Sequence, residues 1–168
     1  MLPDRLGGVS TAMGLRLLVS GALLAAVLTL SSCLSAQLPT ASATLHWATI
    51  DLPRGSYCWN SGGRGECADS AGANDLLKTG YLKPYRTAGG FDAQITFHSA
   101  SEPTGFNVQL VQGPDGKAMT VAASGPHTFS LGMSPPAATG VYVYVVTGRW
   151  AAGDVSFYLA IQLIPGAA

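Results

Sequence analysis

The sequence predicts an all-β protein, built as an antiparallel sandwich of about eight strands. The chain holds 21 Gly and 10 Pro residues together with many Thr, Val and Tyr, a composition typical of strands joined by turns. Beyond residue 33, apolar and polar residues alternate over short segments, and few Leu-rich stretches have the period of a helix. Turn signals separate these segments, a pattern that favours two packed antiparallel sheets.

The expected elements follow one another through short connections. Phe91–His98 alternates most clearly, and we expect its side formed by Ala93, Ile95 and Phe97 to point into the core. The other predicted elements are strands at 44–52, 106–110, 117–122 and 127–131, an extended segment at 81–87, a turn at 113–116, one helical turn at 71–78, and a strong closing hairpin of 141–150 and 155–164 around residues 151–154.

The first 32 residues have the pattern of a secretory signal peptide. Arg16 supplies a positive charge, an almost wholly apolar run continues to Leu30, and two serines precede Cys33. Met13 is an alternative start, because it opens a signal of ordinary length. A bilayer-spanning helix needs roughly 20 consecutive apolar residues, and this run is shorter. An uncleaved anchor and plain secretion with a free thiol are the alternatives to cleavage before the cysteine.

The segment Leu30-Ser31-Ser32-Cys33 resembles the lipobox of bacterial lipoproteins. The resemblance implies that Cys33 is lipidated, becomes the mature N-terminus and holds the protein on the extracytoplasmic face of the cell membrane. Residues 33–44 are small, polar and proline-bearing, so they are expected to form a lipidated cysteine with a flexible tether. Residues 45–165 are then the folded domain.

The charge balance argues against nucleic acid as a partner. The leader contains Asp4, Arg5 and Arg16, so seven of the nine basic and eight of the nine acidic residues remain in the mature part. Nucleic-acid binding needs a basic patch or stripe on one face, and a chain this close to neutral does not supply one.

Cys58 and Cys67 are the two cysteines left once Cys33 is lipidated, and we expect them to form a disulfide. Eight residues lie between them, three of which are glycines that permit a tight return. Closing this loop stabilises the fold by roughly 2.5–3 kcal/mol on the chain-entropy estimate. A redox or metal-binding pair is the alternative, but the C-x-x-C spacing and a nearby histidine are missing.

The residues around these cysteines resemble an uncharacterised domain of lipoproteins and secreted proteins of Gram-positive bacteria. The resemblance rests on Gly55-Ser56-Tyr57-Cys58-Trp59 with Cys67-Ala68-Asp69, and extends more loosely over most of residues 45–165. It implies a β fold outside the cytoplasm and transfers no catalytic residue.

Three segments follow one another in the chain, Ile95-Thr96-Phe97, Phe106-Asn107-Val108 and Gly140-x-Tyr142-x-Tyr144. Their order resembles that of the strands of cupredoxins, and the resemblance implies a Greek-key sandwich of immunoglobulin or cupredoxin type. Type 1 copper sites need two histidines and a cysteine. Phe106 and Val146 stand where this match requires a histidine and the cysteine, and no histidine follows His127. His46, His98 and His127 are scattered over the predicted strands, so we expect no metal and no cofactor.

Aromatic side chains are the candidate ligand-binding residues. Trp150, Tyr142, Tyr144 and Trp59 lie on predicted strands or beside the cysteines, where they form either an exposed binding face or part of the core. No nucleophile-elbow motif or Ser/His/Asp grouping is evident, so we do not expect an enzyme.

We therefore expect a membrane-anchored extracytoplasmic lipoprotein that serves as a non-catalytic binding module for an unknown cell-envelope protein or ligand. An accessory or inhibitory module for a secreted enzyme or transporter, and a structural envelope protein, are the alternatives.

Overall fold

The structure is a computed structural model that describes residues 37–165, apart from 47, 126 and 132–137. The described residues all belong to one compact unit, Ala36–Ala168. Cys33 and the predicted signal peptide therefore lie outside the described residues.

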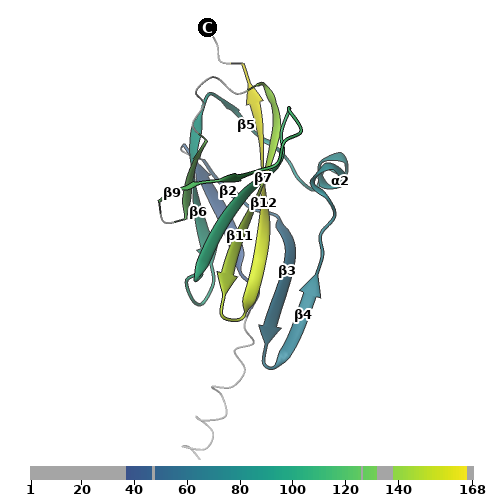
Figure 1. Ribbon diagram of the computed structural model, residues 1–168, viewed down its shortest axis with the longest axis vertical. Coiled ribbons are helices and arrows are strands. Elements are labelled where there is room, and N and C mark those ends of the chain that lie inside the picture. Colours follow the sequence, from purple (N-terminus) through teal and green to yellow (C-terminus); the bar gives the residue numbers. More distant parts are fainter. Residues whose placement is uncertain (1–36, 47, 126, 132–137, 166–168) are drawn as a thin grey trace, which may run out of the picture. The chain divides into compact units, whose positions relative to one another are not determined.

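The described unit is an all-β sandwich of two sheets, which confirms the predicted fold class (Figure 1). The five-stranded sheet has the order β2 (Ala48–Asp51), β1 (Thr40–Leu45), β6 (Phe91–His98), β10 (Thr128–Leu131) and β9 (Ala123–Gly125). The seven-stranded sheet has the order β4 (Arg64–Ala68), β3 (Arg54–Ser61), β12 (Gly153–Ile164), β11 (Gly140–Trp150), β7 (Gly105–Gln112) and β8 (Met119–Val121), and its seventh strand is β5 (Tyr85–Ala88), which pairs with β12.

All strand pairs are antiparallel except β5 with β12, which is parallel. Between β2 and β3, β5 and β6, β6 and β7, β8 and β9, and β10 and β11, the chain crosses from one sheet to the other, as Greek-key connections do. The described residues form twelve strands rather than about eight, because some of them, such as β8 and β9, are only three residues long.

The prediction of a flexible tether at 33–44 is wrong for residues 40–44. Strand β1 begins at Thr40 and pairs with both β2 and β6, so residues before 45 already belong to the domain. Ala41 and Ala43 are 2% and 0% exposed, because their small side chains fit where the two sheets approach each other. The expected single strand at 44–52 is instead a hairpin that turns at His46, which has a φ of 53°.

The main core lies between the two sheets. Ala93, Ile95 and Phe97 point into it, as the alternation of β6 predicts. In the other sheet, every second residue of β12 belongs to the same core. These buried residues are Val155, Phe157, Leu159 and Ile161.

A second apolar cluster covers the opposite face of the seven-stranded sheet. The intervening residues of β11 and β12, Val143, Tyr158 and Ala160, pack there against Leu76 and Leu82. Leu76 belongs to the short helix α2 (Ala73–Lys78), whose N-cap is Gly72. Tyr158 holds the segment just before this helix. Its hydroxyl lies 2.9 Å from Ser70 Oγ and donates to the carbonyl of Ala71 at 3.3 Å.

Candidate functional site

The four predicted ligand-binding aromatics do not form an exposed face. Tyr142, Tyr144 and Trp150 occupy alternate positions of β11, so all three point to the side that faces the other sheet. Tyr144 is 2% exposed, Trp150 5% and Trp59, on β3, 8%, while Tyr142 is partly buried and packs against the same core. Of the two alternatives that the sequence leaves open, an exposed binding face or part of the core, these side chains therefore take the core.

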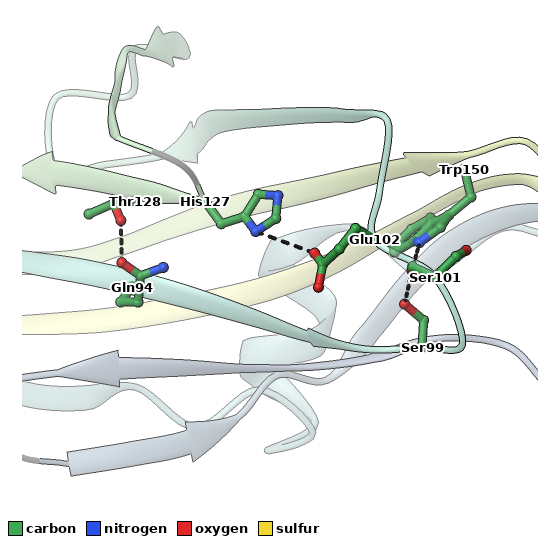
Figure 2. Close-up of polar contacts among 7 residues, drawn as sticks. All are labelled: Gln94, Ser99, Ser101, Glu102, His127, Thr128 and Trp150. Carbon is green, nitrogen blue, oxygen red and sulfur yellow. Dashed lines mark hydrogen bonds and ion pairs between the residues drawn. The ribbon is translucent and has the colours of Figure 1, made fainter.

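The two tryptophans are buried because they belong to a chain of edge-to-face aromatic contacts. The ring centre of Trp150 lies 5.7 Å from that of Trp59 and 5.4 Å from that of Phe97. Its indole Nε1 donates to the carbonyl of Ser101 at 2.9 Å, so the loop after β6 closes over the ring (Figure 2). Ser99 Oγ donates to the same carbonyl at 2.6 Å.

The three histidines lie in separate places. His127 packs edge-on against Phe97 and tilted on Phe106, and its Nδ1 lies 4.0 Å from a carboxylate oxygen of Glu102 (Figure 2). His98 Nε2 lies 3.1 Å from Ser42 Oγ, and His46 is in the turn between β1 and β2. Within the described part of the chain, no group of three or more His, Cys, Asp or Glu side chains is placed to hold a metal ion.

The predicted disulfide between Cys58 and Cys67 is confirmed, and it joins the two strands of the β3–β4 hairpin. The two residues face each other in the strand register, with a Cα–Cα distance of 4.1 Å. Both are exposed, because Trp59 takes the inward side of β3 and its neighbour therefore points outward. Gly62 and Gly63, with φ of 60° and 82°, form the two-residue turn that connects the strands.

A groove of about 310 Å³ opens on the inward side of this hairpin. It is lined by Leu38, Trp59, Ser61, Arg64 and Glu66. The strand register explains the lining, because Trp59 is opposite Glu66 and Ser61 is opposite Arg64, so all four side chains share one face.

The carboxylate of Glu66 is held in place by Tyr57, which lies on the same face of the hairpin. The Tyr57 hydroxyl donates a hydrogen bond to Glu66 Oε1 at 2.6 Å. This hydrogen bond to the carboxylate is the main reason that the pKa of Tyr57 is raised above its usual value. The groove thus offers a fixed carboxylate, a guanidinium, a hydroxyl and the border of an indole ring, which suits polar recognition.

Strand β4, which carries Arg64 and Glu66, is an edge strand of its sheet. In the described residues β4 pairs with β3 alone, so its other side is open. The short Cα–Cα distance between the cysteines marks them as a non-hydrogen-bonded pair. By alternation, Gly65 also belongs to such a pair, and its N–H and C=O point away from β3, toward the open edge.

Of the predicted aromatics, only Trp59 lines this groove; Trp150, Tyr142 and Tyr144 do not. The sequence reasoning missed Leu38, Ser61, Arg64 and Glu66. The glycine-rich turn between the cysteines could have indicated that Ser61, Arg64 and Glu66 lie together. A two-residue turn fixes which hairpin residues share a face.

Comparisons with protein-family models, with curated proteins and with solved structures find no match to this chain. The resemblances to a Gram-positive lipoprotein domain and to cupredoxins therefore stay predictions. Among the described residues, no helix has the length and apolar character needed to cross a membrane.

Proposed function

We propose that this chain is an extracytoplasmic lipoprotein, anchored to the cell membrane through Cys33, whose β-sandwich is a non-catalytic binding module. The observation that carries the proposal is the segment Leu30-Ser31-Ser32-Cys33, which follows an apolar run and stands directly before the folded unit that begins at Ala36. A lipid-modified cysteine at this point would leave the whole domain outside the membrane.

The exposed disulfide supports an extracytoplasmic location. Disulfides persist in oxidising compartments, whereas cytosolic thiols are kept reduced. Cys58 and Cys67 are both solvent-exposed, so reducing agents of the cytosol would have access to the bond. Secretion accounts for both the leader and the bridge.

The β3–β4 hairpin supports a binding role, and the ligand that fits it is an extended segment of a cell-envelope protein. An open strand edge offers backbone hydrogen bonds to an added strand. On β4 this edge runs beside the groove at Trp59, so alternate side chains of the added strand would reach Arg64 and Glu66. The opposite charges of these two residues favour a segment that also carries both signs.

The anchoring is tested with Cys33→Ser in a bacterial host that lipidates secreted proteins. The parent protein is expected in the membrane fraction, labelled by radioactive palmitate, because two acyl chains give stable anchoring. The variant is expected in the medium or as the unprocessed precursor. Equal membrane partition, mass and labelling of the two proteins would overturn the proposal.

The binding surface is tested with a matched pair of substitutions at Gly65. Proline at this position removes the N–H that points to the open edge and leaves the ladder with β3 intact, whereas alanine keeps the N–H. A Cβ at this site meets no atom within 4 Å. A photo-crosslinker at Asn60, the exposed residue opposite Gly65 that does not line the groove, is expected to give a discrete protein adduct in intact cells that Gly65→Ala retains and Gly65→Pro loses. Persistence of the adduct in Gly65→Pro would refute strand addition at β4.

A further inference from the structure

A β-bulge in the seven-stranded sheet turns two neighbouring side chains to its outer face. In the pairing of β7 with β11, Leu110 is opposite Tyr144 but Gln112 is opposite Val143, so Val111 is the extra residue. Leu110 and Tyr144 point into the core, whereas Val143 belongs to the outer apolar cluster. The bulge therefore places the Gln112 side chain on the outer face of the sheet instead of the core side, and it leaves Val111 38% exposed.

These two side chains form one wall of a second groove, with a volume of about 570 Å³. Its other walls are Val145 and Tyr158 of the sheet, Gly116 in the turn after β7, and the segment Gly72–Asp75 at the start of α2. The groove is a defined feature of the fold, because Leu76 is buried against the sheet and the tyrosine hydroxyl bonds to the chain just before the helix. Its size falls within the range of small-ligand sites.

One polar atom of the residues that line this groove lacks a partner. The side-chain oxygen Oε1 of Gln112 is buried and accepts no hydrogen bond from the residues that the structure describes. A buried acceptor without a donor costs about 1–3 kcal/mol, so an unpaired atom of this kind needs an explanation. The Gln112 side chain is partly exposed, so a turn of its amide would bring this oxygen to the groove, where a ligand with an N–H donor would supply the missing bond.

The charge of the lining selects the kind of donor. Asp75 is the one ionised side chain among the residues that line the groove, and it makes no ion pair with any described residue. An anion would be repelled by this carboxylate, whereas a cation would be attracted. The valine side chains of β7 and β11 add an aliphatic surface beside these two acceptors.

We propose that this groove binds an alkylammonium group, with the ammonium held by Asp75 and Gln112 and the methylene chain packed on Val111 and Val145. A free diamine and the side chain of a lysine both carry this chemistry. The proposal is independent of the lipid anchor and of strand addition at β4, because the groove lies on the outer face of the sheet and shares no residue with the groove at Trp59.

The test is a titration of the full-length protein in detergent with 1,5-diaminopentane and, separately, with Nα-acetyl-lysine amide, followed by methyl NMR. Saturable shifts are expected for the methyl groups of Val111 and Val145. The methyl groups of Val146 and Val155, buried between the sheets, serve as internal controls and should not move. Binding of the diamine alone would identify a free amine as the ligand, and binding of both probes would include the lysine side chain.

Two further controls separate charge from shape. 1,5-Pentanediol has the same chain with hydroxyl ends, and equal affinity for it would overturn the alkylammonium proposal. The absence of saturable shifts with both amines at millimolar concentration would overturn it as well.

Substitutions then assign the two acceptors. Gln112→Met keeps the side-chain length and removes the acceptor, and is expected to weaken binding at least about tenfold, as for a hydrogen bond to a charged group. Gln112→Glu is expected to strengthen it. Asp75→Asn, an exposed and conservative change, is expected to weaken binding about threefold. The matched control is Asp69→Asn, an exposed carboxylate just before the same helix that does not line the groove. Equal effects of the two Asp→Asn changes would contradict the assignment.

Discussion

Two hairpins of the seven-stranded sheet have the same turn length and are stabilised in different ways. The β11–β12 hairpin joins strands of 11 and 12 residues, and most of their side chains are buried on one face or the other. The β3–β4 hairpin joins strands of 8 and 5 residues, and four of the five residues of β4 are exposed. The first hairpin is held by burial, whereas the second, at the edge, is held by a disulfide.

The difference teaches where this fold can present function. Side chains on the core side of the long hairpin, such as Tyr144 and Trp150, are buried between the sheets and cannot contact a ligand. A covalently closed edge hairpin needs little burial, so its backbone edge and its charged residues remain accessible. The two hairpins meet at Gly153, where a Cβ would lie 2.0 Å from the carbonyl oxygen of Cys58, so only glycine allows this close approach.

The largest effect is expected from Trp150→Ala in the buried hairpin. The change removes an indole that is 5% exposed and leaves the carbonyl of Ser101 without this donor. We expect a loss of about 3–5 kcal/mol in the free energy of unfolding. Urea denaturation followed by circular dichroism measures it. A loss no larger than that of an exposed substitution such as Asp154→Ala would contradict the role of burial in this hairpin.

The next effect is expected from the double change Cys58→Ser and Cys67→Ser in the edge hairpin. Opening this short loop is expected to cost about 2.5–3 kcal/mol. Because both serines would be exposed, little packing is lost and the cost comes mainly from the unfolded chain. Thermal unfolding of oxidised, reduced and double-mutant protein gives the value. The reduced parent should match the double mutant, and a melting temperature unchanged by reduction would show that burial alone holds this hairpin.

A smaller effect, dependent on pH, is expected from Tyr144→Phe. Burial, with a lesser contribution from Tyr142, raises the pKa of Tyr144 well above its usual value of 10. Above pH 10 the unfolded chain therefore loses the phenolic proton before the folded protein does, so the stability falls as the pH rises. At pH 11 one such group lowers the stability by about 1.4 kcal/mol.

The measurement is the free energy of unfolding between pH 8 and roughly pH 11. The phenylalanine variant is expected to lose less stability over this range than the parent protein. The exposed Tyr81→Phe is the control for removal of a hydroxyl group. Identical slopes for the Tyr144 variant and the parent would contradict the proposed burial of this hydroxyl.

The smallest effect is expected from Gly63→Ala in the turn of the edge hairpin. Its φ of 82° is unfavourable for a side chain, and the change is expected to cost about 1 kcal/mol. Gly65→Ala is a matched control, because an added Cβ meets nothing within 4 Å at either position and only Gly63 has a positive φ. Comparing the two thermal midpoints isolates the backbone conformation, and equal midpoints would speak against it.

Prediction from the sequence worked where one face of a strand was apolar and the other polar. The bounds of β6 are those expected, because Ala93, Ile95 and Phe97 alternate with polar residues. On β11 the direction of the aromatics could not be derived, since both faces are apolar: Val143 and Val145 pack beneath the α2 segment on the far side. Alternation fixes which side chains share a face, but not which face meets the other sheet.

The groove at Trp59 and the start of the domain needed long-range contacts. Residues 40–43 have the composition of a linker, and only the pairing of β1 with β6 shows that small side chains are required there. Leu38 reaches the groove because of that same strand, so its part in the site could not be predicted from local pattern. The placement of Arg64 and Glu66 on one face of the hairpin, by contrast, could be predicted from the two-residue turn.

The early start of β1 also sets how far the domain can stand from a membrane. Six residues lie between Cys33 and Thr40, and a fully extended chain of this length spans at most roughly 25 Å. On the proposed anchoring, the domain is confined to a thin layer above the lipid. Any partner held in the same layer would meet it at a high effective concentration, in the millimolar range for short linkers. Weak contacts at the edge strand would then be sufficient for a membrane-bound partner and insufficient for one that diffuses freely.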